Sequence, residues 1–153
     1  MIESFRHPGI VVKDMEAAIR FYCDYLGHKV IVDFIEKGDY FNKLIGLKDT
    51  EARVVKVNSP DGIYLELIEF INYPVPESSE SSFASIGINH ICYTVKGIDS
   101  LYKRLVNLGV EFISPPLASD FDPVKTCFCY GPDRVLVQFV EVTDPDSIRD
   151  GLK

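Results

Sequence analysis

The chain has 153 residues, of which 46% are hydrophobic and 25% charged, so its length and composition are those of one folded globular domain and exclude general disorder. The net charge of −7, with no run of Lys and Arg, argues against a nucleic-acid partner. Because no apolar run approaches the ~18 residues of a spanning helix and the start lacks a signal-peptide layout, we expect a cytoplasmic protein that does not associate with membranes.

The first half of the chain predicts a strand, a helix and three further strands. An apolar opening strand lies within residues 5–13, and Asp14 is placed to cap a helix over 15–25. Gly27 then ends this helix in the left-handed conformation. Three strands follow, with a short helix between the first two; the strands are expected at 29–34, 52–58 and 63–70, and the helix at 40–47.

The second half predicts the same order of elements. Its opening strand lies within residues 88–96, Asp99 is placed to cap a helix over 100–108, and Gly109 ends that helix. The loop 114–123 has the length of a pocket lid and is equally consistent with a plain surface loop. Three strands complete this half, at 110–113, 124–130 and 135–142.

The two halves form an internal repeat of the pattern βαβββ. His7 and His90, at equivalent places in the opening strands, lie 83 residues apart, and Glu66 and Gln138, in the closing strands, lie 72 residues apart. We expect an α+β fold in which two tandem βαβββ modules form a curved, mixed, eight-stranded sheet around a metal-binding cavity. The whole chain, 1–153, is then one domain, with module 1 at about 5–71, an exposed linker at 72–86, module 2 at about 87–142 and a tail at 143–153.

The repeated polar positions are those with ligand chemistry. Glu66 and Gln138 are flanked by apolar residues on their strands, and a buried carboxylate needs a compensating partner. A divalent cation is such a partner, because imidazole nitrogens with carboxylate or amide oxygens suit Zn, Ni, Co, Mn or Fe. His7 and His90 would bring two such nitrogens near each other if the opening strands meet at a pseudo-twofold axis.

Other polar residues have simpler expectations. Glu69 and Glu141, three residues beyond the ligand positions, are expected as solvated charges on the outer face, and His28 as a surface residue in a turn. Arg53, with Lys125 as a second cation, is the basic residue proposed to bind a substrate anion. The four cysteines include no C-x-x-C pair, so we expect buried apolar side chains: Cys23, Cys92, Cys127 and Cys129.

These motifs resemble the vicinal oxygen chelate superfamily, which includes glyoxalase I, methylmalonyl-CoA epimerase, bleomycin-resistance proteins, fosfomycin-modifying enzymes and extradiol dioxygenases. The resemblance covers roughly residues 5–142. It rests on His7 with the Val-Lys-Asp-Met helix start, on the run 21–27, on Asp61-Gly62 with Leu65-Glu66-Leu67, and on the Asn-His-Ile-Cys run 89–92.

The resemblance implies one divalent metal ion per chain, held by His7, Glu66, His90 and Gln138. Because Glu66 is the one carboxylate at a ligand position, we expect it to be the catalytic base as well. It implies a lyase or isomerase, glyoxalase I-like or methylmalonyl-CoA epimerase-like, acting on a small oxygen-chelating substrate through an enediolate-type intermediate. Gln138 departs from the Glu that many members have there, so Glu66 is the one carboxylate among the four ligands.

Two alternatives remain open from the sequence. One is an Fe(II)-dependent dioxygenase of the same superfamily, using His7, His90 and Glu66. The other is a binder of the bleomycin-resistance kind, which sequesters a small molecule without chemistry. The expected partner is a small-molecule substrate in each catalytic reading, and a homodimer is what the superfamily implies.

Overall fold

The computed structural model describes residues 2–76, 83, 84 and 86–146. The chain divides into two compact units, unit 1 (Met1–Glu77) and unit 2 (Ser78–Lys153). Parts of the predicted linker, at 77–82 and 85, and of the predicted tail, at 147–153, lie outside the described residues. Each unit is one βαβββ module and is described by itself below.

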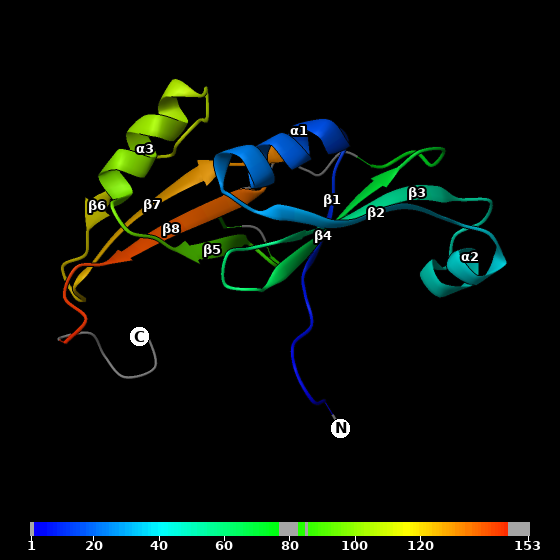
Figure 1. The fold of residues 1–153 in the computed structure, drawn as a ribbon, viewed down its shortest axis with the longest axis horizontal. Coiled ribbons are helices and arrows are strands. Elements are labelled where there is room, and N and C mark those ends of the chain that lie inside the picture. Colours follow the sequence, from blue (N-terminus) through cyan, green and yellow to red (C-terminus); the bar gives the residue numbers. More distant parts are fainter. Residues whose placement is uncertain (1, 77–82, 85, 147–153) are drawn as a thin grey trace. The chain divides into compact units, whose positions relative to one another are not determined.

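Unit 1 is a four-stranded mixed sheet with two α-helices (Figure 1). The sheet order is β1-β4-β3-β2, with β1 parallel to β4 and the other pairs antiparallel. Helix α1 continues into the π-helical segment η1, so that together they span the helix predicted over 15–25. The elements are β1 (Gly9–Val11), α1 (Met15–Ile19), η1 (Arg20–Tyr25), β2 (Lys29–Lys37), α2 (Asp39–Ile45), β3 (Glu51–Asn58) and β4 (Tyr64–Phe70).

Unit 2 repeats this arrangement in the order β5-β8-β7-β6, again with the opening strand parallel to the closing strand. Strand 110–113 is reduced to a single bridge between Phe112 and Cys129, and the short strand β6 lies instead within the loop 114–123. The elements are β5 (His90–Thr94), α3 (Ile98–Asn107), β6 (Leu117–Ala118), β7 (Val124–Tyr130), the 3-10 turn η2 (Pro132–Arg134) and β8 (Leu136–Val142).

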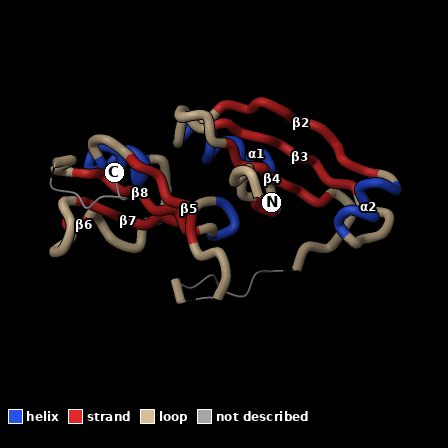
Figure 2. The backbone as a smooth tube through the Cα atoms, turned by 90° about the horizontal axis from the view of Figure 1, so that it is seen from below, coloured by secondary structure: helices blue, strands red, loops and turns tan. Residues whose placement is uncertain are grey.

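The register of the strands confirms the internal repeat. Gly9 on β1 pairs with Glu66 on β4, and Cys92 on β5 pairs with Gln138 on β8. His7 and His90 each lie two residues before the paired residue of the opening strand, so the two modules place these positions alike. The α+β class and the tandem βαβββ order are confirmed, and the eight strands are arranged as two sheets of four (Figure 2).

Each sheet has two unlike faces, which alternate along the strands. The face that packs against the helix, here called the helix-covered face, contains much of the core: in unit 1 Val55, Val57 and Leu67 are fully buried on it, and β4 contacts α1. The opposite face, here called the open face, bears Glu66 in unit 1 and Gln138 in unit 2. In unit 2 the matching core of the helix-covered face includes Cys127, Cys129, Val137 and Phe139, with Leu105 from α3.

The helix starts show one confirmed cap and one wrong cap. Asp14 accepts a hydrogen bond from the Ala17 backbone at 2.9 Å, as predicted. Asp99 does not cap α3, which begins after Gly97; instead the Glu141 carboxylate accepts from the backbone N–H of Gly97 and, at 3.2 Å, of Ile98.

Glu69 and Glu141 are therefore not simple solvated charges. Glu69 accepts a hydrogen bond from the Met15 backbone at 3.1 Å, at the equivalent helix start of unit 1. In both modules a carboxylate on the helix-covered face of the closing strand binds orphan N–H groups at the positive end of the helix, which stabilises that helix start.

His28 corrects another expectation. Its side chain is 4% exposed, because the chain turns inward after Gly27 and the ring packs edge-on against Tyr22. Burial lowers the pKa of His28, against smaller opposing effects of the Val57 backbone and the Asp61 charge. Among the described residues, none of the helices has the length and apolar character needed to span a membrane.

Candidate functional site

The open face of unit 1 brings His7, Glu66 and Lys56 together. The Nε2 atom of His7 lies 3.5 Å from Oε2 of Glu66, and Nζ of Lys56 lies 3.1 Å from the same oxygen. Tyr64 supports this cluster, since its ring packs on the His7 ring at 4.8 Å between centroids and has the Lys56 ammonium above it at 5.9 Å. Two of the predicted ligands thus share one space with a cation that the sequence analysis did not single out.

The cluster is half-buried. The side chains of His7, Glu66 and Lys56 are 18%, 22% and 26% exposed, so water screens their charges only in part. The buried Nδ1 atom of His7 has no hydrogen-bond partner in the structure. A ligand that bonds to this nitrogen would be stabilised, because a buried polar atom without a hydrogen-bond partner has lost its hydration without compensation.

The sequence analysis missed Lys56, although counting residues back from the turn of the β3–β4 hairpin places it opposite Glu66. The turn of Ser59 to Ile63 closes with a 2.7 Å hydrogen bond from the Ser59 backbone to the Ile63 carbonyl, and Gly62 has the positive φ of 94° that the turn requires. This turn pairs Asn58 with Tyr64, so two residues further along each strand Lys56 must face Glu66.

The open face of unit 2 carries His90 and Gln138. Nδ1 of His90 lies 3.2 Å from Oδ1 of Asn89, which favours the tautomer with the proton on Nδ1 and the lone pair on Nε2. The Gln138 amide nitrogen donates a 3.1 Å hydrogen bond to the Thr126 hydroxyl, and this contact orients the amide. Both side chains are held so that a ring nitrogen and an amide oxygen remain as electron-pair donors.

Aromatic side chains flank His90. Phe83 stacks on the imidazole at 6.1 Å between centroids, and Phe128 meets it edge-on at 5.4 Å. Phe128 pairs with Gln138 across β7 and β8, as Lys56 pairs with Glu66 across β3 and β4. The two modules therefore differ at this pair: unit 1 has a charged Lys–Glu pair, and unit 2 has a neutral Phe–Gln pair.

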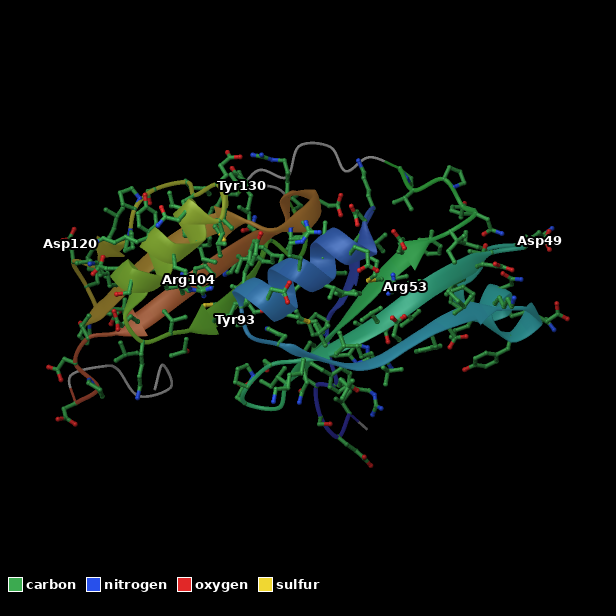
Figure 3. All side chains as sticks on the ribbon, turned by 45° about the horizontal axis from the view of Figure 1, so that its top comes forward. Asp49, Arg53, Tyr93, Arg104, Asp120 and Tyr130 are labelled. Atoms are coloured by element: carbon green, nitrogen blue, oxygen red, sulfur yellow. The ribbon has the colours of Figure 1, made fainter. Side chains whose placement is uncertain are left out.

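Arg53 lies away from this cluster. It shares the helix-covered face of β3 with Val55 and stands opposite Glu69 in the register. Figure 3 labels it on the strand beside α1, and its guanidinium donates to Asp33 at 2.8 and 3.0 Å and to Glu16 at 2.6 Å. The structure does not bring Arg53 to Glu66, and Arg53 instead ties β2 to the helix.

Lys125 is placed in the same way in unit 2. It pairs with Glu141 in the register, and its ammonium contacts both carboxylate oxygens of Asp99 on α3 at 2.6 Å. The second basic group considered for substrate binding thus also lies on a helix-covered face. Of the three basic residues compared, Lys56 is the one that lies beside a predicted ligand.

The donor set fits a divalent metal ion by type. An imidazole nitrogen 3.5 Å from a carboxylate oxygen in unit 1, and an oriented imidazole and amide in unit 2, are nitrogen and oxygen ligands of the kinds that first-row ions take. Among the described residues, no three His, Cys, Asp or Glu side chains form a group that could hold a metal ion. The fit is therefore one of ligand type at each predicted position.

Two of the four cysteines, Cys127 and Cys129, lie on the helix-covered face of unit 2 and add no ligand to the donor set. Burial raises the pKa of Cys127 to about 11 and of Cys129 to about 12, which keeps both thiols protonated and unreactive. Cys92 is exposed on the open face of β5, contrary to the expectation that all four are buried, and Cys23 is half-buried.

Comparison of the sequence with known proteins identifies the family of this chain. Residues 6–128 match the family model described as the glyoxalase/bleomycin resistance protein/dioxygenase superfamily. The chain is also similar to an uncharacterized protein, YwkD, of Bacillus subtilis strain 168, with 25% identity over 144 residues that cover 92% of this chain and 98% of the relative.

Solved structures support the fold. A glyoxalase family protein from Bacillus cereus matches with a TM-score of 0.83 and 21% identity, covering 92% of this chain and 95% of the other. FosX, a fosfomycin resistance protein from Listeria monocytogenes whose structure is a complex with Mn(II) and sulfate, matches with a TM-score of 0.61 and 19% identity, covering 92% and 93%. With the family model spanning most of its length, the chain belongs to the glyoxalase/bleomycin resistance protein/dioxygenase superfamily.

Proposed function

We propose that this protein is a metal-dependent lyase or isomerase of the glyoxalase or epimerase kind, acting on a small substrate with neighbouring oxygens. The observation that carries the proposal is the 3.5 Å approach of His7 Nε2 to Glu66 Oε2 on the open face of unit 1. The same register in unit 2 holds His90 and Gln138, so all four predicted ligand positions keep donor side chains.

His7, Glu66, His90 and Gln138 would hold one divalent ion, whether Zn, Ni, Co, Mn or Fe. When bound, such an ion polarises an oxygen of the substrate and stabilises negative charge that develops there. The chain's own residues do the rest. Glu66 takes the proton from the carbon next to the substrate carbonyl and can return it to a neighbouring position, which is the step common to isomerases of this kind.

The surrounding residues orient this chemistry. Tyr64 packs on His7 and fixes the plane of its ring, while Asn89 and Thr126 hold His90 and Gln138 in their donor orientations. Phe83 and Phe128 provide apolar walls beside His90, which lower the local access of water to a bound substrate.

Metal binding tests the first half of the proposal. The protein is stripped with a chelator and titrated with Mn(II), Zn(II) and Ni(II) by calorimetry, with bound metal counted by plasma mass spectrometry. We expect about one ion per chain and a loss of affinity in each of the variants His7→Gln, Glu66→Gln and His90→Gln. Glu36→Gln, a change on edge strand β2 outside the predicted ligand set, is the matched control and should bind as the parent does.

Proton exchange tests the second half without a known substrate. A panel of 2-oxo and 2-hydroxy carbonyl compounds is incubated with the metal-loaded protein in D2O, and loss of the signal of the proton next to the carbonyl is followed by NMR. We expect exchange with the parent and none with Glu66→Gln. Metal binding without exchange on any compound, but with oxygen uptake in the Fe(II) form, would favour the dioxygenase alternative.

A second candidate function is a non-catalytic small-molecule binder of the bleomycin-resistance kind. The observation in its favour is that Lys56 already compensates the charge of Glu66, so the carboxylate has a partner of its own within unit 1. The aromatic walls beside His90 suit a flat organic ligand. Absence of metal binding by the parent protein, together with saturable binding of an aromatic compound, would favour this candidate over the enzyme.

A further inference from the structure

Lys56 occupies a position beside Glu66 in which it would compete with a divalent ion for the carboxylate. Its ammonium lies 3.1 Å from Oε2 of Glu66, the oxygen that also faces His7. The backbone fixes this approach, because Lys56 and Glu66 are direct partners in the antiparallel pairing of β3 and β4. Two cations of the same sign cannot both sit against one carboxylate oxygen without repulsion, so binding of the metal must move the ammonium aside.

The second module shows that this lysine is not required by the fold. The register partner of Gln138 is Phe128, and unit 2 forms the same sheet with this uncharged pair. A lysine at the equivalent place in unit 1 therefore adds one positive charge to the open face without being needed for strand pairing. Both strand partners of the ligand position differ between the modules, Gly9 against Cys92 on one side and Lys56 against Phe128 on the other, and only the Lys56 difference changes the charge.

We infer that Lys56 is the anion-binding group of this site: it neutralises Glu66 when the site is free of metal, and it receives an acidic oxygen group of the substrate when metal has taken Glu66. The substrate class is then a small molecule that carries a carboxylate, phosphonate or phosphate beside its chelating oxygens. This inference rests on the proposed metal centre and adds the charge of its substrate.

The charge balance supports an anionic substrate. A divalent ion with Glu66 as its one carboxylate and three neutral ligands leaves the centre near +1, and Lys56 raises the local charge to about +2. Because His7, Glu66 and Lys56 are only 18–26% exposed, water does not screen this excess fully. An acid group on the substrate compensates this excess positive charge, whereas a neutral substrate leaves it uncompensated.

The test compares the parent with Lys56→Gln and Lys56→Arg, and with Lys37→Gln as the matched control. Lys37 lies on β2 of the same sheet, 64% exposed, with Glu51 at 3.7 Å, so its removal takes the same charge from unit 1 away from the cluster. Two quantities are measured by calorimetry for each protein: the affinity for Mn(II) alone, and the affinity of the Mn(II)-loaded protein for inorganic phosphate and for malonate. Circular dichroism melting curves check that each variant is folded.

We expect Lys56→Gln to bind Mn(II) about tenfold more tightly, since its competitor for Glu66 is gone. The same variant should bind phosphate and malonate at least about tenfold more weakly, while Lys56→Arg keeps most of the anion affinity and Lys37→Gln changes neither quantity. Preference for phosphate over malonate indicates a phosphorus acid group in the substrate, and the reverse preference indicates a carboxylate.

Two results overturn the inference separately. If the parent binds Mn(II) but Lys56→Gln keeps full affinity for both anions, Lys56 is not the anion-binding group, although the metal centre stands. If the parent binds no metal under conditions where it is folded, the proposed function fails and this inference fails with it.

Discussion

Removal of the Glu141 carboxylate tests how helix α3 begins. The carboxylate accepts hydrogen bonds from the backbone N–H groups of Gly97 and Ile98, and it places a negative charge at the positive end of the helix. No side chain of the helix start itself caps these groups, because the N-cap residue is glycine. The variant Glu141→Ala therefore removes the capping carboxylate of α3 and leaves water as the replacement.

The expected loss follows from the two contacts and the charge. Loss of an N-cap side chain costs about 0.5–2 kcal/mol, and a carboxylate near a helix N-terminus contributes about 0.3–1 kcal/mol. We expect about 1.5 kcal/mol for Glu141→Ala, which lowers the melting temperature by about 3–6 °C if the 153 residues unfold together. Glu69→Ala should cost about 0.5 kcal/mol, because Asp14 also caps α1 and remains in place.

Urea and thermal denaturation followed by circular dichroism measure these differences. The control is Asp99→Ala, which removes the residue that the sequence pattern selects as the cap and which in the structure pairs with Lys125. An exposed ion pair of this kind contributes about 0–1 kcal/mol, so Asp99→Ala should cost about 0.5 kcal/mol. A larger loss for Asp99→Ala than for Glu141→Ala would refute this account of the helix start.

Three further outcomes are expected from the pKa shifts. Burial lowers the pKa of His28 below its usual 6.5, so the unfolded chain binds the proton more strongly than the folded protein. The free energy of unfolding should therefore fall as the pH drops below about 6.5. Urea midpoints measured between about pH 7.5 and 5.5 should depend less on pH in His28→Gln than in the parent. The hydrogen bond from Arg53 holds the pKa of Asp33 below its usual value, so Arg53→Gln should return that pKa toward 3.8 in an NMR titration while leaving anion affinity unchanged. The buried thiols of Cys127 and Cys129 should react with a thiol reagent only after unfolding, and fast labelling of either in the folded protein would contradict their placement.

Much of the fold follows from the sequence because the repeat gives every element twice. The closing strands and the long strands before them form where their alternation predicts, and Gly27 and Gly109 end their helices with positive φ of 81° and 86°. Strand 110–113 fails because it is four residues long and has one bridge, at Phe112, to hold it. Short elements of this kind depend on their neighbours more than on their own residues.

The site is less visible in the sequence, for a physical reason. Local spacing identifies His7 and His90 or Glu66 and Gln138 as equivalent, but contacts between strands decide what each side chain faces. Glu141 reaches the start of α3 from 43 residues away, which no local capping pattern contains. Lys56 is the exception, since the tight turn makes its partner a matter of counting along the hairpin.

Each closing strand carries two functional positions whose spacing along the chain must be preserved. In each module the ligand position and the helix-capping carboxylate are three residues apart, Glu66 with Glu69 and Gln138 with Glu141, and they point to opposite faces. A single inserted or deleted residue between them would turn one of the two to the wrong side of the sheet. We therefore expect variation in length among related chains to fall in the loops and not within the closing strands.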